Sequence, residues 1–256
     1  MDKNAIQAII PELLEIAEAA GEAILEVYRT VIAVEYKGDN SPVTAADMAA
    51  HHIIMDGLTR LTPDTPILSE EAANIPWSTR QQWQRYWLVD PLDGTREFLN
   101  RSGEFTVNIA LIEGGQPILG VVSVPVTGDY YWGGEATGAW HRGSVGTVRE
   151  LKVSAPASKL RVLASKSHLN EETRAYIDKL GPVELVQAGS SLKICRIAEG
   201  KADLYPRLGP TSEWDTAAAH AVLLGAGGRI STVKGDPLLY NQEETLLNPH
   251  FIARFQ

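Results

Sequence analysis

The stretch Tyr86-Trp87-Leu88-Val89-Asp90-Pro91-Leu92-Asp93-Gly94-Thr95 joins an apolar run to a short acidic segment. The apolar run predicts a buried strand, and Pro91 and Gly94 predict an acidic turn at its end. Asp90 and Asp93 place two carboxylates three residues apart, just before a Gly-Thr pair where a helix could begin. Hard cations such as Mg²⁺ take oxygen ligands, and the free N–H groups that open a helix suit a phosphate. The stretch therefore predicts metal-assisted chemistry on a phosphate.

The composition restricts the class of protein and its partners. A chain of 256 residues that is 44% hydrophobic and 21% charged is long enough to bury a substantial core. The formal net charge of −9 argues against a nucleic acid polymer as a partner, because such a partner needs a basic face. An acidic protein that handles anionic phosphates needs cations between the two, which agrees with a metal site.

The sequence also carries signals of location. We find no signal-peptide layout at the N-terminus and no apolar run of the roughly 18 residues that a membrane span needs. These features predict a cytoplasmic protein with no transmembrane segment. They leave open peripheral contact with the inner face of the cell membrane, and a monomer or a homodimer. The single cysteine, Cys195, excludes an internal disulfide, and its neighbours predict a half-buried, unreactive position in a helix.

The pattern of elements differs between two parts of the chain. Residues 1–155 predict an α+β half that carries most of the acidic residues named below, and residues 156–256 predict an α/β half with short connections. In the first part we expect helices over 4–29 and 44–61, strands over 31–36, 66–68, 130–134 and 138–141, and a hairpin of 105–113 with 116–124. In the second part we expect strands over 160–164, 183–186, 202–205 and 229–231, and helices over 170–180, 190–199 and 213–225.

Three further acids could join the first two, and each has an ordinary structural explanation. Glu70 closes the short strand that ends at Leu68, where α/β proteins place catalytic groups, but a surface charge is its default explanation. Asp47 in Thr44-Ala45-Ala46-Asp47 and Asp215 in Ser212-Glu213-Trp214-Asp215 both fit a capping box, which is the default explanation for each. The apolar surroundings of Asp215 predict partial burial, and a buried charge favours a nearby cation.

Taken together, these segments resemble the inositol monophosphatase superfamily of Mg²⁺-dependent, lithium-sensitive phosphatases. The matching pieces, in the family's order, are Asp47 in Pro42-Val43-Thr44-Ala45-Ala46-Asp47, then Glu70-Glu71, Asp90 to Thr95, and Trp214-Asp215. The resemblance is closer still to the bacterial 3'(2'),5'-bisphosphate nucleotidase branch. The stretches that carry it are 84–89, 103–112, 165–168, 189–193, 204–211 and 246–249.

The resemblance implies an α-β-α-β-α sandwich with the metal site between the two halves. It implies two or three Mg²⁺ ions, whose ligands are Glu70, Asp90, the carbonyl of Leu92, Asp93 and Asp215. It also implies that Thr95, paired with Asp47 and assisted by Glu70, orients and deprotonates the attacking water. The turn over 37–43 is similar to a family loop beside a third, weaker metal.

The resemblance further implies a small bisphosphorylated nucleotide as the substrate. Removal of the 3'-phosphate of 3'-phosphoadenosine 5'-phosphate would give AMP and phosphate. The implied substrate-binding residues are Leu92, Asp93, Gly94, Thr95, Ser165, His168, Ser190, Lys193, Arg207 and Asp215. Without the family, a solvated surface cation is the default explanation for Lys193 and Arg207, and a capping or core histidine for His168.

Three alternative functions are considered. An inositol monophosphatase or a broader sugar phosphatase would share the metal core and differ only in the second half. A haloacid-dehalogenase phosphatase carries a similar Asp-x-Asp-Gly-Thr motif, but Asp90 and Asp93 are three residues apart, so that assignment fails on spacing. A non-catalytic phosphonucleotide sensor would bind tightly without turnover, although every residue implied as a ligand is present.

Overall fold

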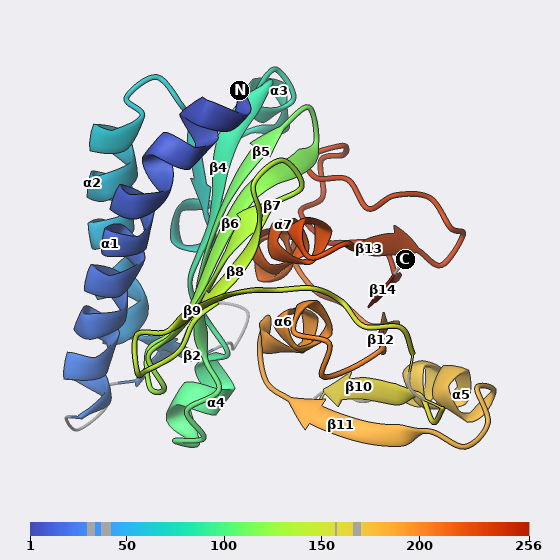
Figure 1. The fold of residues 1–256 in the computed structure, drawn as a ribbon. Helices are drawn as coiled ribbons and strands as arrows, with labels where there is room; N and C mark the ends of the chain where they lie inside the picture. The colour runs from blue at the N-terminus through green and yellow to red at the C-terminus, as the bar shows by residue number, and fades with distance from the viewer. Residues whose placement is uncertain (30–33, 37–41, 157, 166–169, 256) are drawn as a thin grey trace.

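A computed structural model describes residues 1–29, 34–36, 42–156, 158–165 and 170–255, and it shows alternating layers of helices and sheets (Figure 1). Helices α1 (Lys3–Tyr28) and α2 (Ala45–Leu61) cover one face of a seven-stranded sheet. Helices α6 (Leu192–Ala198) and α7 (Ala217–Gly225) lie between this sheet and a five-stranded sheet. Helix α5 (Glu171–Asp178) covers the outer face of the smaller sheet. The predicted α-β-α-β-α sandwich is confirmed.

The large sheet has the strand order β3-β4-β5-β6-β7-β8-β9. Strands β3 and β4 are parallel, and every later neighbour is antiparallel. The predicted hairpin is confirmed by the antiparallel pairing of β5 with β6. Its tight two-residue turn is possible because Gly114 and Gly115 both have positive φ. The strands are β3 (Ile67–Ser69), β4 (Arg85–Asp93), β5 (Thr106–Glu113), β6 (Gln116–Val124), β7 (Asp129–Gly134), β8 (Gly138–Arg142) and β9 (Val148–Glu150).

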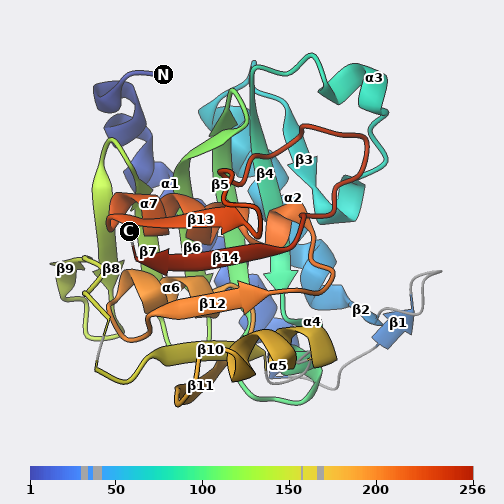
Figure 2. The ribbon, with the colours of Figure 1, turned by 90° about the vertical axis from the view of Figure 1, so that its right-hand side faces the viewer.

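The small sheet has the order β11-β10-β12-β14-β13 (Figure 2). Strand β10 is parallel to β11 and β12, as expected for α/β connections, but β14 runs antiparallel between β12 and β13. We predicted no strand for the C-terminal run 251–255, which forms β14. The strands are β10 (Arg161–Ser165), β11 (Glu184–Ala188), β12 (Leu204–Arg207), β13 (Gly228–Thr232) and β14 (Phe251–Phe255).

The remaining elements are short. Strands β1 (Val34–Tyr36) and β2 (Pro42–Thr44) pair antiparallel in a separate two-stranded sheet. The other pieces are the single-turn helices α3 (Trp77–Arg80) and α4 (Thr95–Leu99) and the 3₁₀ turns η1 (Glu70–Ala72) and η2 (Glu213–Asp215). Residues 31–33 of the predicted first strand and 37–41 of the predicted turn lie outside the described residues.

Both faces of the large sheet are buried, which explains the unbroken apolar run that leads into the acidic segment. Trp87 and Val89 pack in the cluster that includes α1 and α2, whereas Tyr86 and Leu88 pack in the cluster that includes α6 and α7. A strand covered on both sides needs apolar residues on both sides. The next residue in the alternation, Asp90, therefore points toward the layer of α6 and α7.

Helix α7 lies very close to the centre of the large sheet. A Cβ atom added at Gly120 in β6 would lie 2.1 Å from the carbonyl oxygen of Ala218 in α7. The alanine-rich helix and the bare glycine together allow this approach. The 3₁₀ turn η2, which precedes α7 in the chain, contacts β4.

The two sheets share one hydrophobic cluster through α6 and α7, which contains Leu88 of the large sheet and Phe251 and Ala253 of the small one. This packing joins the two parts of the chain. The division at residue 155 stays a prediction.

Candidate metal centre

The acidic segment is the bulged end of strand β4 and not the turn that we predicted. Asp90 is paired with Asn108 and Asp93 with Thr106, so β4 contains one more residue than β5 over this interval. In a regular strand, residues three apart point to opposite faces, but the extra residue of a bulge removes that difference. Leu92 confirms the change, because it joins the cluster on the side of α1 and α2. The bulge therefore turns both carboxylates toward α7.

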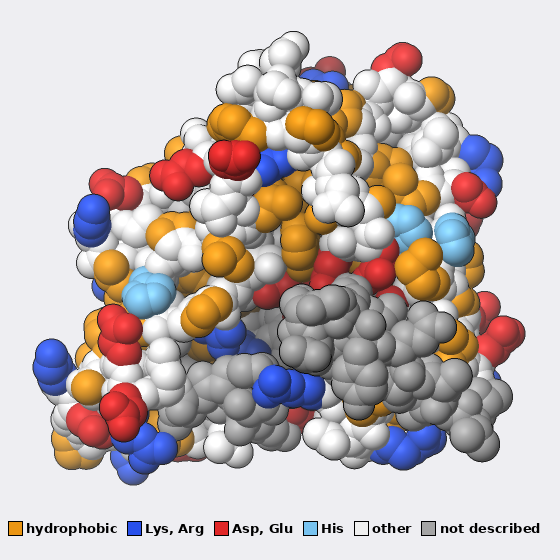
Figure 3. Space-filling model, turned by 180° about the vertical axis from the view of Figure 1, so that it is seen from behind, with side chains coloured by type: hydrophobic (Ala, Val, Ile, Leu, Met, Phe, Trp, Pro, Cys, Tyr) orange, Lys and Arg blue, Asp and Glu red, His pale blue; other side chains and the backbone are white. Residues whose placement is uncertain are grey.

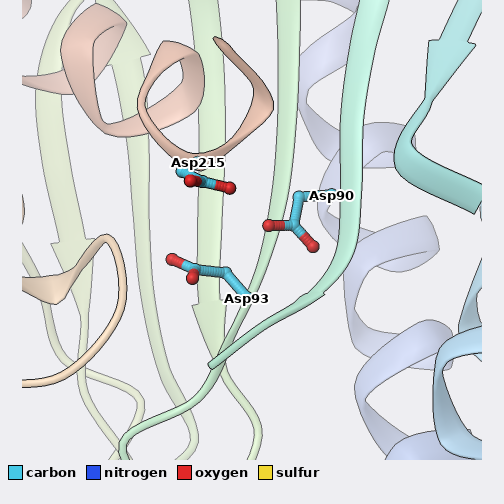
Figure 4. Close-up of side chains that lie close together, drawn as sticks. All are labelled: Asp90, Asp93 and Asp215. Carbon is cyan, nitrogen blue, oxygen red and sulfur yellow. The ribbon is translucent and has the colours of Figure 1, made fainter. Parts of the chain in front are cut away.

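Three carboxylates meet at this bulge. Carboxylate oxygens of Asp90, Asp93 and Asp215 lie within 4.8 Å of one another (Figure 4). Asp90 and Asp93 come from β4, and Asp215 comes from η2, within the other half of the chain. Asp and Glu side chains also gather near the middle of one face of the molecule (Figure 3).

Asp215 both caps its turn and faces the other carboxylates. Its Oδ2 accepts hydrogen bonds from the backbone N–H of Ser212 (2.8 Å) and from the hydroxyl of Thr211 (2.6 Å). The predicted capping box with Ser212 is thus confirmed. The predicted helix 213–225 is wrong at its start, because Thr216 leaves the helical region and separates η2 from α7.

Asp93 is oriented from across the molecule. Its Oδ2 accepts a hydrogen bond from the backbone N–H of Ser191 (2.6 Å) and a longer one from Asn108 (3.5 Å). The hydroxyl of Ser191 in turn donates to Asn108 (2.8 Å) and lies 2.9 Å from that of Thr106. Our sequence reasoning missed the roles of Thr106, Asn108 and Ser191. Their polarity within buried segments was the signal that could have found them.

The electrostatics of the cluster favour a cation. Burial raises the pKa of Asp90 well above its usual range, and the charges of Glu70, Asp93, Asp215 and Asp47 raise it further. Burial, and then the charge of Asp215, raise the pKa of Asp93 to about 8. Burial also raises the pKa of Asp215, against its hydrogen bonds to Thr211 and Ser212. Groups of this kind carry full charge only when a cation offsets their repulsion.

Glu70 and Asp47 also belong to the surroundings of Asp90, because the charge of each raises its pKa. Glu70 opens η1 directly after β3, and Asp47 is buried in the first turn of α2. The ring Nδ1 of His51, one helical turn after Asp47, lies 2.9 Å from the hydroxyl of Ser69. This buried contact joins the two elements that carry Asp47 and Glu70, and our sequence reasoning missed it as well.

Gly94 and Thr95 follow the carboxylates directly. Gly94 has φ +96° and precedes α4, whose first residue is the half-buried Thr95. The first N–H groups of a helix have no partner within the helix, so they face outward from its start. Leu92 lies between the two carboxylates, and its N–H donates to Asp90 Oδ1 (3.0 Å).

Lys193 is a buried cation beside the acids, so the alternative of a solvated surface residue is wrong. Its side chain is 6% exposed, its Nζ donates to the carbonyl of Ser190 (2.6 Å), and it lies over the ring of Tyr205. Burial lowers the pKa of Lys193 to about 8, while the charge of Asp93 raises it. Arg207 at the end of β12 also lowers it by like-charge repulsion, which places both cations in one region.

Two polar atoms in this basic region have no hydrogen-bond partner among the described residues. They are the hydroxyl of Ser190 and the Nε of Arg207, and both are buried. Ser190 also has φ +42°, an uncommon backbone conformation for a residue other than glycine. The side chain of Ser165 and all of His168 lie outside the described part of the chain, so those two predictions stay predictions.

Cys195 is fully buried in α6, and burial raises the pKa of its thiol. This agrees with the predicted unreactive cysteine. Among the described residues, no helix is both long enough and apolar enough to cross a membrane.

Comparison with known proteins identifies the family. The model of the inositol monophosphatase family matches residues 6–254. The 3'(2'),5'-bisphosphate nucleotidase CysQ of Escherichia coli strain K12 is 51% identical over 246 residues, which cover 95% of this chain and 98% of that protein. The protein of the same name from Haemophilus influenzae is 38% identical, over 95% of this chain and 91% of its own length.

Solved structures show the same relationship. The crystal structure of CysQ from Bacteroides thetaiotaomicron, described as a bacterial member of the inositol monophosphatase family, superposes with a TM-score of 0.87 at 41% identity. The match covers 97% of each chain. A Thermotoga maritima inositol monophosphatase shares the fold, with a TM-score of 0.77 at 23% identity and coverage of 94% of this chain and 90% of the other. This chain belongs to the inositol monophosphatase family.

Proposed function

We propose that this protein is a Mg²⁺-dependent 3'(2'),5'-bisphosphate nucleotidase, a phosphoric monoester hydrolase. Its substrate is 3'-phosphoadenosine 5'-phosphate, and its products are AMP and phosphate. The observation that carries the proposal is the cluster of Asp90, Asp93 and Asp215. It lies in a chain that is 51% identical to a protein named 3'(2'),5'-bisphosphate nucleotidase. The family is metal-dependent, and an all-oxygen set of buried carboxylates suits a hard divalent cation. The cytoplasmic location stays a prediction from the sequence.

Five groups would hold two or three Mg²⁺ ions: the carboxylates of Glu70, Asp90, Asp93 and Asp215, and the carbonyl of Leu92. When bound, the ions supply charge that stabilises the phosphoryl and leaving oxygens and acidifies water. The charges of Glu70, Asp93, Asp215 and Asp47 all act on Asp90, and its two oxygens would allow it to serve two ions. Glu70 would complete one side of the centre, and Asp93 with Asp215 would complete the other.

Thr95 and Asp47 would handle the proton of the attacking water. A threonine hydroxyl is a poor base by itself, because its pKa lies far above 7. Asp47 is a buried carboxylate whose charge acts on the same centre, so it can receive the proton that Thr95 passes on. Glu70 would help to orient the water.

The substrate's two phosphates would occupy different halves of the protein. The N–H groups of Gly94 and Thr95 would hold the phosphate that is removed, beside Leu92, Asp93 and Asp215. The other phosphate would lie against Ser190, Lys193 and Arg207, with Ser165 and His168 next to them. The Ser190 hydroxyl and Arg207 Nε have no hydrogen-bond partner among the described residues, and a second phosphate would provide acceptors for both as well as an anion for the buried Lys193.

A phosphate-release panel tests this function. We would compare 3'-phosphoadenosine 5'-phosphate with inositol 1-phosphate, with and without Mg²⁺ and with added Li⁺. We expect Mg²⁺-dependent, Li⁺-inhibited release from the nucleotide, with AMP as the nucleoside product by chromatography. Faster release from inositol 1-phosphate would favour the sugar phosphatase alternative. Tight nucleotide binding without release would indicate a sensor.

A further inference from the structure

The turn that carries Asp215 is enclosed by a distant segment of the chain. We call residues 240–248, which lie between β13 and β14, the C-terminal strap. The backbone N–H of Glu213 donates to the carbonyl of Leu246 (2.8 Å), and the N–H of Asn248 donates to the carbonyl of Thr211 (2.9 Å). The strap therefore pairs with the chain on both sides of Ser212. We predicted no role for residues 234–245.

Glu213 is the first of two side chains that join the turn to the strap. It is 5% exposed, and both of its carboxylate oxygens accept from the backbone N–H of Asn241, at 2.9 and 3.0 Å. Asn241 is itself held by Arg80, whose Nη1 donates to Asn241 Oδ1 (2.7 Å) and whose carbonyl accepts from Asn241 Nδ2 (2.7 Å). Arg80 also donates to the carbonyls of Glu243 and Glu244.

Asn248 is the second such side chain, at the other end of the strap. It is 8% exposed, and its Nδ2 donates to the carbonyl of Ser212 (2.7 Å) and to the hydroxyl of Thr216 (3.2 Å). These two residues lie on either side of Asp215 in the sequence. A single amide thus fixes the spacing of the chain across the turn.

The turn needs such support, because Asp215 is repelled by the acids that it faces. Carboxylate oxygens of Asp90, Asp93 and Asp215 lie within 4.8 Å of one another, so without a cation the repulsion between their charges pushes η2 away from β4. The cap to Ser212 fixes Asp215 within its own turn but does not fix the turn against β4. Contacts between η2 and the strap supply that second restraint.

We propose that Glu213 and Asn248 are positioning residues for Asp215, which hold η2 against β4 and so set the affinity of the centre for Mg²⁺. The inference rests on the proposed function in that it takes Asp215 as a metal ligand. Neither residue touches the reacting atoms. Loosening the turn should therefore weaken metal binding and leave the chemistry at saturating metal nearly unchanged.

Calorimetric titration of Mg²⁺ into the metal-free protein tests the inference without any substrate. For Asn248→Ala and Glu213→Ala we expect the half-saturating Mg²⁺ concentration to rise about tenfold or more, which is typical when support behind a ligand is lost. Glu213→Gln keeps a carbonyl acceptor for the Asn241 N–H, so it should remain closer to the unaltered protein. At saturating Mg²⁺, kcat of Asn248→Ala should stay within about threefold, as expected for an effect on binding alone.

Asp203→Asn is the matched control. Asp203 is another buried carboxylate that accepts from a backbone N–H, that of Arg161 (2.7 Å), but it precedes β12 at the end away from Arg207. It should lower stability without changing Mg²⁺ binding. Unchanged Mg²⁺ binding in both alanine variants, or an equal loss in Asp203→Asn, would overturn the inference. The expected calorimetric shifts in a protein that does not hydrolyse the nucleotide would support it while refuting the proposed substrate.

Discussion

Asp90 and Asp93 owe their common direction to one extra residue in β4. Pro91 lies within this irregularity, where its missing N–H costs no regular ladder hydrogen bond. The arrangement places like charges close together in a buried site, which is unfavourable unless a cation is bound. In the proposed metal centre, the fold therefore gives up stability for function.

Asp90→Asn should separate these two effects. We expect phosphate release to fall about 10³-fold or more, because the residue that serves two ions is lost. We expect the metal-free protein to unfold at the same temperature or higher, because a repelled charge has been removed. A phosphate-release assay measures the loss of activity, and thermal unfolding in EDTA measures the stability of the metal-free protein. Asp56→Asn on the exposed side of α2 is the control and should change neither. A nearly normal Mg²⁺-dependent rate would refute the proposed role of Asp90.

Thr95 can be tested with a pair of substitutions. Thr95→Ala removes the hydroxyl that we propose as the proton relay, so kcat should fall by about 10²-fold or more, while KM changes much less. Thr95→Ser keeps the hydroxyl and should recover most of the rate. Steady-state kinetics at saturating Mg²⁺ measures both. An equal loss in the two variants would point to packing at the start of α4 and not to proton transfer.

Among the elements, the contact of α7 with β6 depends on Gly120. In Gly120→Ala the new methyl group would lie 2.1 Å from the Ala218 carbonyl oxygen, so α7 must move. We expect the free energy of unfolding to fall by about 1–3 kcal/mol, as is typical of overpacking. Urea denaturation measures this change. Gly143→Ala is the control: its Cβ would make only ordinary contacts at 3.6 Å, so it should stay within about 0.5 kcal/mol. Equal stability of Gly120→Ala would mean that α7 can shift freely.

The long periodic elements could be predicted from the sequence, but the irregular ones could not. Helices α1 and α2 and the hairpin of β5 and β6 follow from patterns within one segment. The bulge at Asp90–Asp93 depends on the register of β5, and strand β14 depends on the gap between β12 and β13. Neither partner can be read from the segment itself. For the same reason Asp215 could be predicted from its local motif, whereas Asn108 and Ser191 could not, because their contacts are with distant parts of the chain.

At the scale of the whole molecule, the site lies where the two sheets are joined. Asp90 and Asp93 belong to the large sheet, and Asp215 leads into the helix between the sheets. Ser191 at the start of α6 donates to Asp93, so the proposed metal ligands and the proposed substrate groups meet at the same boundary. Binding of a cation there should stabilise the joined core as well as the site, since it acts on the folded state alone.

The stability of the metal-free protein should therefore fall as pH rises from about 6.5 to about 8. Buried carboxyls with a raised pKa, such as Asp93 at about 8, hold protons in the folded state that the unfolded chain has already released, so raising the pH costs folding free energy. The lowered pKa values of His51 and His220 make stability rise with pH, but only below the ordinary histidine value of 6.5. The lowered pKa of Lys193, about 8, also makes stability rise with pH, but only above this interval.

Thermal unfolding in EDTA across this interval, repeated with saturating Mg²⁺, measures the effect. Each proton held only in the folded state changes the free energy of unfolding by up to about 1.4 kcal/mol per pH unit. Mg²⁺ takes the place of those protons, so it should raise the unfolding temperature more at pH 8 than at pH 6.5. Asp90→Asn should flatten the dependence in EDTA, because it relieves the repulsion that raises the pKa of its neighbours. A metal-free stability that stays constant or rises across the interval would contradict the assignment of these carboxylates as a repelled, cation-seeking cluster.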